Sequence, residues 1–290
     1  MDCEYEYCHL ERFSRDIGIS KEDLVTAFNI ERDFHTEILM EHDRRKRKRM
    51  YREVYERVHP IYGRSSNTIK MQNPKDRIVR LFRKELEGKS ILDVGCGTGY
   101  FLISVANQLE HKRLVGIDIS TPVLPKNQKD IQFINADIVD FDLHEDFDVV
   151  FSDQVLEHIA PSDLPIHLSS IKKALKNDGT LIILMPNRLF GPHDVTRILD
   201  YTYTGRIGAM GTHLNESTYS EMIPMLKVHG FSEFQTVVPI PKVKHAFPRL
   251  RMNPSILTHI ENSRLLLGIL YRIRWRSACI ARLEIVLICR

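Results

Sequence analysis

The 290-residue chain is predicted to be an α/β protein with an open, mostly parallel sheet, doubly wound so that helices cover both faces. Short apolar runs alternate with segments of helical spacing, glycines cluster where the first run ends, and 43% hydrophobic residues suffice for a substantial core. Right-handed crossovers then fix how the strands are wound. The strands are expected at residues 90–94, 113–117, 131–134, 147–152 and 180–185.

Residues 1–87 are expected to form an N-terminal helical region, and residues 88–290 the sheet-containing core. Lys21 to about Arg57 has helix-forming composition, with Ser20 as the N-cap. Pro60 and Gly63 interrupt this pattern. A further short helix over 75–87 leads into the first strand.

The segment after the fifth strand predicts a helix over 217–229, ended by Gly230, and a strand over 232–238. Residues 239–277 are too long for a hairpin loop, so they are expected to be an insertion with a helix at about 255–275. Its apolar residues precede arginines, which is compatible with a helix on a membrane surface. A packed face or a contact between two copies in a homodimer is favoured, and the run is too short to span a bilayer.

The turn after the first strand carries the strongest functional signal. Gly95, Gly97 and Gly99 lie where a strand hands over to a helix, so backbone can approach a nucleotide-like ligand at the helix start. A dinucleotide fingerprint would place glycine or alanine where this chain has Tyr100. Asp118 follows the second strand and can accept hydrogen bonds from two ribose hydroxyls. An adenosine-containing cofactor is therefore expected.

These features resemble, in their order, the class I S-adenosylmethionine-dependent methyltransferases. Asp93 and the three glycines are similar to the first motif, and Ala136-Asp137-Ile138 to the segment that contacts adenine. Residues 153–159, Asp-Gln-Val-Leu-Glu-His-Ile, resemble the small-molecule branch that includes quinone-precursor and glycan methyltransferases. The resemblance covers roughly residues 51–234. It implies a seven-stranded Rossmann-like sheet, with the last strand at 281–289 antiparallel to 232–238.

The resemblance also implies a cofactor site for S-adenosyl-L-methionine, released as S-adenosyl-L-homocysteine. Asp93 would lie beneath the amino-acid portion, Asp118 would hold the ribose diol and Asp137 would accept from the adenine amino group. The N-terminal helices, with Tyr51, Tyr55, His59 and Tyr62 near their end, would form a lid. The residues expected to bind the cofactor are Asp93, Gly95, Cys96, Gly97, Gly99, Asp118, Ile119, Asp137, Ile138 and Asp153.

Three histidines follow strands at the ligand-binding edge and are candidates for a general base: His158, His193 and His213. His193 is preferred because Gly191 and Pro192 make a rigid turn beside it. His158 has an alternative role in hydrogen bonding to backbone, and the residues after His213 have an alternative role in capping the next helix.

The sequence favours metal-independent O-methylation of a small-molecule or sugar acceptor. It lacks the Asn/Asp-Pro-Pro-Tyr/Phe loop typical of enzymes that methylate nucleobase amines or glutamine amides, and it has no carboxylate cluster for magnesium. No metal is expected, since the five cysteines have no ligand spacing. Two alternatives stay open: a nicotinamide-dependent oxidoreductase and a catalytically silent cofactor-binding scaffold.

The basic run at 44–49 invites a nucleic-acid interpretation, which neighbouring acidic residues and a net charge of only +3 disfavour. The scattered cysteines and the absence of a secretory signal at the start of the sequence predict a cytoplasmic protein without a transmembrane segment.

Overall fold

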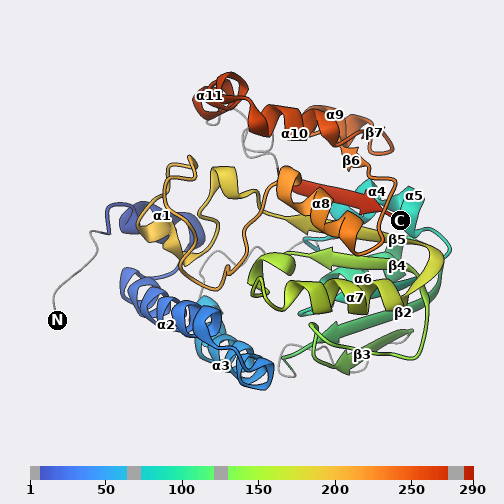
Figure 1. Ribbon diagram of the computed structural model, residues 1–290, viewed down its shortest axis with the longest axis horizontal. Helices are drawn as coiled ribbons and strands as arrows, with labels where there is room; N and C mark the ends of the chain where they lie inside the picture. Colours follow the sequence, from blue (N-terminus) through green and yellow to red (C-terminus); the bar gives the residue numbers. More distant parts are fainter. Residues whose placement is uncertain (1–6, 64–72, 121–129, 274–283) are drawn as a thin grey trace.

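The computed structural model describes residues 7–63, 73–120, 130–273 and 284–290. Its centre is a six-stranded sheet of order β3-β2-β1-β4-β5-β8 (Figure 1). The first five strands are parallel, and β8 runs antiparallel to β5. The five strands expected between residues 90 and 185 are confirmed. The bounds are β1 Lys89–Val94, β2 His111–Asp118, β3 Ile131–Asn135, β4 Phe147–Asp153, β5 Leu175–Met185 and β8 Ile285–Cys289.

Both faces of the sheet are covered by helices, which confirms the doubly wound class. Alternate residues of each strand point to opposite faces, so Ile91 and Leu92 belong to two different apolar cores. The core that contains Ile91 is closed by α4 (Asp76–Leu81), α5 (Arg83–Leu86) and α6 (Tyr100–Gln108). The opposite core is closed by α7 (Leu164–Ala174) and α8 (Tyr219–Val228).

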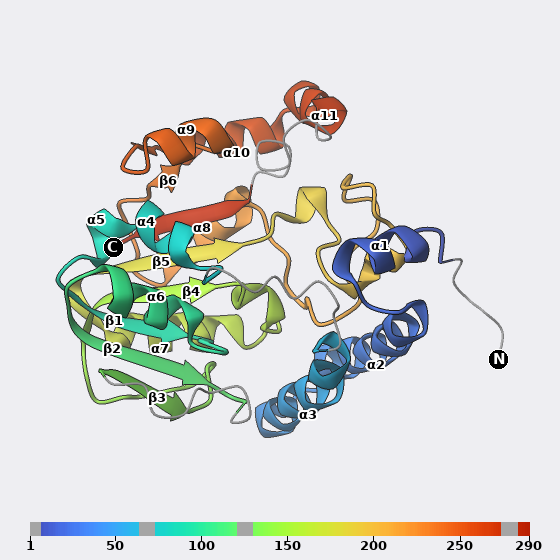
Figure 2. The same cartoon turned by 180° about the vertical axis from the view of Figure 1, so that it is seen from behind.

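The N-terminal helical region consists of α1 (Leu10–Ile17), α2 (Lys21–Met40) and α3 (Arg44–Tyr62). Ser20 is the N-cap of α2, and its hydroxyl accepts from Asp23 N at 3.0 Å, as predicted. The expected single helix is divided after Met40, because the Asp43 carboxylate caps a new helix by accepting from Arg45 N. Figure 2 shows α2 and α3 lying beyond the carboxyl ends of β1 and β2.

The strand expected over 232–238 is reduced to a single bridge in the six-stranded sheet. Gln235 pairs with Ile288 in the antiparallel sense, and Ser232 exchanges hydrogen bonds with Arg290. From residue 232 to 235 the chain advances three residues, while its partner advances only two, from 290 to 288. The pairing therefore contains a bulge, and Glu233, within the longer segment, has φ of 51°. The chain then leaves the sheet, and β6 (Thr236–Val237) pairs with β7 (Arg251–Met252) instead.

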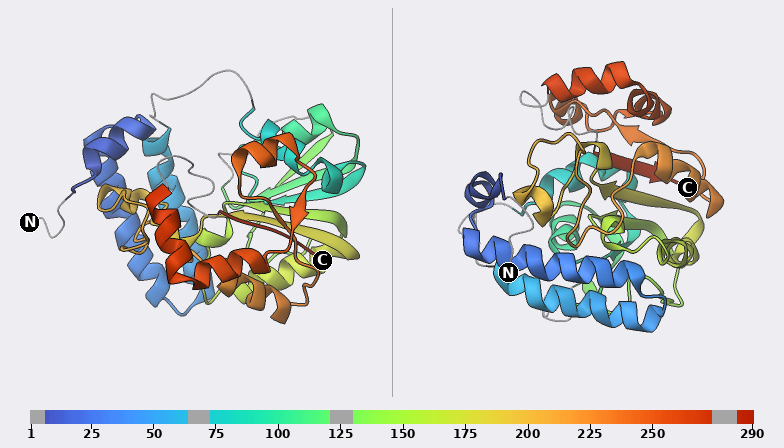
Figure 3. Two further views of the ribbon diagram at one scale, coloured as in Figure 1. Left: turned by 90° about the horizontal axis from the view of Figure 1, so that it is seen from above. Right: turned by 60° about the vertical axis from the view of Figure 1, so that its left-hand side comes forward.

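The insertion contains α9 (Pro241–Ala246), α10 (Ser255–Asn262) and α11 (Arg264–Ile273), so the helix expected over 255–275 is divided at Ser263. Residues 274 and 275 of the expected helix lie outside the described residues. In Figures 1 and 3 the insertion lies beside the β8 edge of the sheet, away from α2 and α3. The buried Glu261 carboxylate fastens α10 to α8 by accepting from Tyr219 N at 2.9 Å.

Apolar residues of α11 lie on both its inner and outer sides. Leu270 is buried in the core, whereas Leu265 is 74% exposed. The predicted packed face is therefore present, together with an exposed apolar surface. None of the helices in the described part of the chain is both long and apolar enough to cross a membrane.

The basic run at the start of α3 fastens that helix to the core. Arg44 Nη2 lies 2.8 Å from Asp137 Oδ2, and Lys48 Nζ lies 3.3 Å from the same oxygen. Arg47 is buried, and its Nε donates to Asp163 Oδ2 at 2.9 Å. Three of the six basic residues of the run therefore form ion pairs with the core.

We expect Arg47→Met to lower the free energy of unfolding by about 3–5 kcal/mol, because it leaves the fully buried Asp163 carboxylate without its cation. Arg49→Met is the matched control: Arg49 lies in the same run but is exposed, and its loss should change stability by less than about 0.5 kcal/mol. Urea unfolding followed by circular dichroism measures both. Equal effects for the two variants would contradict the assigned role.

Candidate cofactor and acceptor site

The glycine turn wraps over the end of β2. Gly95 N and Cys96 N both donate to the carbonyl oxygen of Ile117, at 2.8 and 3.0 Å. Gly95 has φ of 73°, and a Cβ there would lie 2.6 Å from a methyl group of Val155. Packing therefore requires glycine at 95. At Gly97, where φ is 49°, a Cβ would meet no protein atom within 4 Å, so this side of the turn is open.

A cavity of about 210 Å³ lies against this turn. Tyr55 and His59 of α3 line one side of it, and Ile119 and Ile138 provide apolar walls suited to an adenine ring. Its lining comprises Tyr55, His59, Gly95, Gly97, Asp118, Ile119, Ser120, Ile138, Gln154, Val155 and His158.

Asp118 is oriented at this cavity by two backbone amides. Its Oδ2 accepts from Gly97 N at 2.9 Å, and its Oδ1 accepts from Ser120 N at 2.8 Å. A carboxylate oxygen has two lone pairs, so each oxygen can accept one more hydrogen bond, as a ribose diol requires. The arrangement fits the ribose of an adenosine.

Asp93 lies one residue before the end of β1 and Asp153 ends the neighbouring β4, but neither lines the cavity. Burial, followed by the nearby Asp153 charge, raises the pKa of Asp93 well above its usual range. Lys75 Nζ lies 2.7 Å from Asp153 Oδ2. Cys96 is buried in the turn, where burial raises the pKa of its thiol. A Cβ on Gly116 would lie 2.8 Å from the Cys96 sulfur, so Cys96 packs against β2.

Asp137 has protein partners of its own. Its Oδ2 is paired with Arg44 and Lys48, and its Oδ1 accepts from Val139 N at 3.0 Å. It lies outside the cavity lining, while its neighbour Ile138 lies within it. A contact of Asp137 with adenine stays a prediction.

The structure gives the three candidate histidines different surroundings. His193 Nε2 lies 3.0 Å from the carbonyl oxygen of Asn187, and its Nδ1 accepts from Arg197 Nη2 at 3.0 Å. Burial lowers the pKa of His193 to about 4. With both ring nitrogens engaged, His193 holds the 187–197 segment together and offers no ring nitrogen to an acceptor.

His158 and His213, in contrast, are brought together. Their ring centroids are 4.6 Å apart and nearly perpendicular. His158 Nδ1 lies 3.0 Å from the Thr212 carbonyl oxygen, and His213 Nδ1 lies 2.7 Å from Glu216 Oε1. Burial lowers the pKa of His158 to about 3 and that of His213 to about 4, so both rings are neutral at pH 7.

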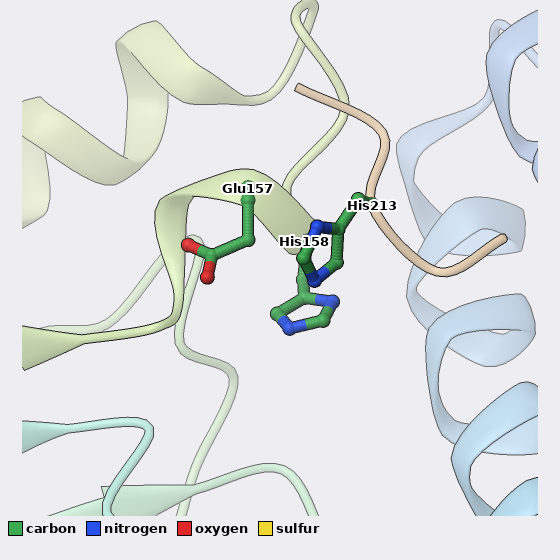
Figure 4. A group of neighbouring side chains, drawn as sticks. All are labelled: Glu157, His158 and His213. Carbon is green, nitrogen blue, oxygen red and sulfur yellow. The ribbon is translucent and has the colours of Figure 1, made fainter. Parts of the chain in front are cut away.

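Glu157 joins these two histidines and was not singled out from the sequence as a site residue. Its two carboxylate oxygens are buried and have no hydrogen-bond partner within the described ranges. Burial raises its pKa well above the usual range. One ligand atom from each of Glu157, His158 and His213 lies within 4.8 Å of the others, so this group is a candidate metal site (Figure 4). The adjacency of Glu157 and His158 was visible in the sequence, but the approach of His213 was not.

A second, small cavity lies between α2, α3 and the 211–214 segment, and His158 lines both cavities. Its volume is about 10 Å³, room for about one water molecule. Glu31 closes it by accepting from Thr212 N at 2.9 Å and from the Tyr62 hydroxyl. Burial, followed by the nearby Asp194 charge, raises the pKa of Glu31 to about 7.

The part of the chain that carries most of this site matches a known protein family. A family model described as a methyltransferase domain matches residues 68–232, more than half of the chain. The chain belongs to this methyltransferase family. It is a class I S-adenosylmethionine-dependent methyltransferase, and its cofactor is S-adenosyl-L-methionine. The nicotinamide alternative is thereby removed.

Among its relatives, a carboxy-S-adenosyl-L-methionine synthase of Nautilia profundicola is 30% identical over 169 residues, which are 51% of this chain and 71% of the relative. A ubiquinone biosynthesis O-methyltransferase of Actinobacillus pleuropneumoniae is 33% identical over 141 residues, covering 44% of this chain and 58% of the relative. The chain thus spans 71% of the first relative and 58% of the second.

Among solved structures, a phosphoethanolamine N-methyltransferase of Haemonchus contortus in complex with S-adenosyl-L-methionine has a TM-score of 0.52 at 17% identity. The match covers 82% of this chain and 59% of that one. At this identity the likeness shows the fold alone.

We expect Gly97→Ala to lower the affinity for S-adenosylhomocysteine at least tenfold, because the added methyl group projects into the open side of the turn. Its cost in stability should be about 1–2 kcal/mol, from the left-handed backbone. Isothermal titration calorimetry measures the affinity. Unchanged affinity in Gly97→Ala would place the cofactor elsewhere.

Gly95→Ala is the contrasting variant, because its methyl group would collide with Val155 inside the protein. It should lose more stability than Gly97→Ala. Thermal unfolding of the two variants compares them directly.

The raised pKa of Glu31 predicts a pH effect on stability. Between its ordinary value of 4.5 and about 7 the unfolded state has released this proton while the folded state retains it, so stability falls as pH rises. Glu31→Gln should reduce that slope by up to about 1.4 kcal/mol per pH unit. Exposed Glu22→Gln is the control and should leave it unchanged. Urea unfolding at pH 4.5 to 7.5 measures the slope, and a Glu31→Gln protein with the original slope would contradict the prediction.

Proposed function

We propose that this methyltransferase transfers a methyl group to a hydroxyl of a small-molecule or glycan acceptor. The observation that carries the proposal is the position of His158, which lines both the cavity beside Asp118 and the cavity under the lid. An acceptor under the lid would meet the cofactor across this ring. The name of the Actinobacillus relative, an O-methyltransferase, also favours oxygen as the acceptor atom.

The cofactor would be held by residues that the structure already orients. The backbone of Gly95 and Gly97 permits close approach, the Asp118 carboxylate would accept from the ribose, and Ile119 and Ile138 would enclose the adenine. S-adenosylmethionine supplies a methyl group on a sulfonium, which is already an activated leaving group. The protein therefore contributes mainly alignment and exclusion of water.

The lid supplies the exclusion of water. The walls of the small cavity include the apolar side chains of Phe34, Ile38 and Val54. Glu31 and His35 fasten α2 to the 211–212 segment through Thr212 N and the Gly211 carbonyl oxygen. Because the cavity is small, only the reacting end of an acceptor fits beneath a closed lid, and the rest of the molecule would require the lid to open.

His158 is the residue placed to act on the acceptor. Its Nδ1 faces the Thr212 carbonyl oxygen, an acceptor, so Nδ1 carries the proton and Nε2 presents a lone pair. That lone pair can accept a hydrogen bond from the acceptor hydroxyl. His213, packed against the ring, and Tyr55, whose ring lies edge-on at 5.9 Å, hold His158 in orientation.

The test is an acceptor screen with S-adenosylmethionine, in which formation of S-adenosylhomocysteine is measured by mass spectrometry. A methylated hydroxyl compound should appear with it. His158→Ala should lower kcat about 100-fold or more while binding of S-adenosylhomocysteine is retained. His144→Ala, at an exposed surface position, is the matched control.

Two results would overturn the proposal. Methylation of amines, with no hydroxyl compound methylated, would show that oxygen is not the acceptor atom. Tight binding of S-adenosylhomocysteine without turnover on any acceptor class would favour the silent-scaffold alternative.

A further inference from the structure

We propose that Glu157, His158 and His213 bind a divalent transition-metal ion at the wall shared by the cofactor cavity and the lid cavity. The sequence predicted no metal, because its cysteines have no ligand spacing and it lacks a carboxylate cluster for magnesium. The fold creates a different ligand set, two imidazoles and one carboxylate. Figure 4 shows Glu157 and His158 leaving the same turn, η2 (Leu156–His158), while His213 reaches them from a separate segment.

The first support is the carboxylate of Glu157. Its side chain is fully buried, and within the described ranges neither oxygen has a hydrogen-bond partner. Nearly all buried polar atoms in proteins are satisfied, and an orphaned carboxylate carries a large desolvation cost. A bound cation would remove that cost. The backbone oxygen of Glu157 accepts from Leu214 N at 2.7 Å, so the carboxylate is held beside the segment that carries His213.

The second support is the orientation of the two imidazoles. His158 Nδ1 is directed at the Thr212 carbonyl oxygen. His213 Nδ1 is directed at Glu216 Oε1, which also accepts from His193 N at 2.8 Å and is therefore an acceptor. Both histidines thus carry the proton on Nδ1 and keep Nε2 as the lone-pair atom. Metal-binding histidines are oriented in this way, with the remote N–H donating to a carbonyl or carboxylate.

The ligand set selects the class of ion. Imidazole nitrogens with a carboxylate suit zinc, iron, cobalt or nickel, whereas magnesium and calcium prefer oxygen ligands. At bond lengths of about 2.0–2.2 Å a tetrahedral ion holds its ligand atoms roughly 3.3 Å apart. The three ligand atoms now lie within 4.8 Å of one another, so binding would shorten the distances between them by up to about 1.5 Å.

Three protein ligands leave a coordination position for a further ligand. Because His158 lines both cavities, that position would be accessible to an acceptor hydroxyl. With the ion bound, His158 Nε2 would coordinate the metal instead of accepting from the hydroxyl. The ion would orient the oxygen and promote release of its proton to solvent, and the oxygen would then take the methyl group as the carbon–sulfur bond breaks and S-adenosylhomocysteine leaves. This role rests on the proposed function, whereas metal binding by the three residues does not.

The experiment is a titration of the chelator-treated full chain with Co²⁺, followed by visible absorption, together with equilibrium dialysis against Zn²⁺. One equivalent of either ion should bind, and Co²⁺ should develop the d–d absorption of a site with nitrogen and oxygen ligands. Glu157→Gln keeps the size of the side chain, and His213→Asn keeps a donor toward Glu216 while it removes Nε2. Each should weaken metal binding at least 100-fold, whereas exposed His144→Ala should leave it unchanged.

Calorimetric titration with S-adenosylhomocysteine shows that each variant is folded, since the cofactor residues are untouched. Absence of metal binding in the wild-type chain, or full binding in folded Glu157→Gln, would overturn the metal site. If metal binds as expected but its removal leaves methyl transfer unchanged, the role at the acceptor fails while the site stands. Metal binding without any methyl transfer would overturn the proposed function alone.

Discussion

The buried contact between α3 and the core is the interaction on which the rest of the site depends. Arg47 and Tyr51 both bind the Asp163 carboxylate, and the Tyr51 hydroxyl in turn accepts from Ala160 N. These groups join α3 to the segment between η2 and α7. Tyr55, one turn further along α3, then faces the cavity at the ends of the strands. Without this contact, neither cavity would have its outer wall.

The sequence was most informative where local chemistry determines structure. The glycine turn, the strand preceding Asp118 and the Ser20 cap depend on neighbouring residues, and each was predicted at its observed place. The division of the long helix at Asp43 was missed because the composition on both sides favours helix equally. The bulge near Glu233 was missed because it depends on pairing with a strand that lies 50 residues away in the chain.

The site was less predictable than the fold because its members come together only in three dimensions. His193 looked favourable in its rigid turn, yet Asn187 and Arg197 occupy its ring. Asp137 lies beside a cavity residue, yet cations of the basic run hold it. In the sequence, Glu157 was only one residue of the motif at 153–159. Its burial beside His213 depends on a segment that no local pattern connects to it.

The antiparallel strand β8 has a consequence for how the protein is made. It pairs with β5 along five residues, and all five side chains of β8 are buried. Until residues 285–289 have left the ribosome, β5 presents an open edge with unpaired backbone groups and uncovered apolar surface. More than 90 residues of chain separate the two strands. The sheet therefore closes only after those intervening residues have been made, and the nascent chain is vulnerable to edge-to-edge association during that interval.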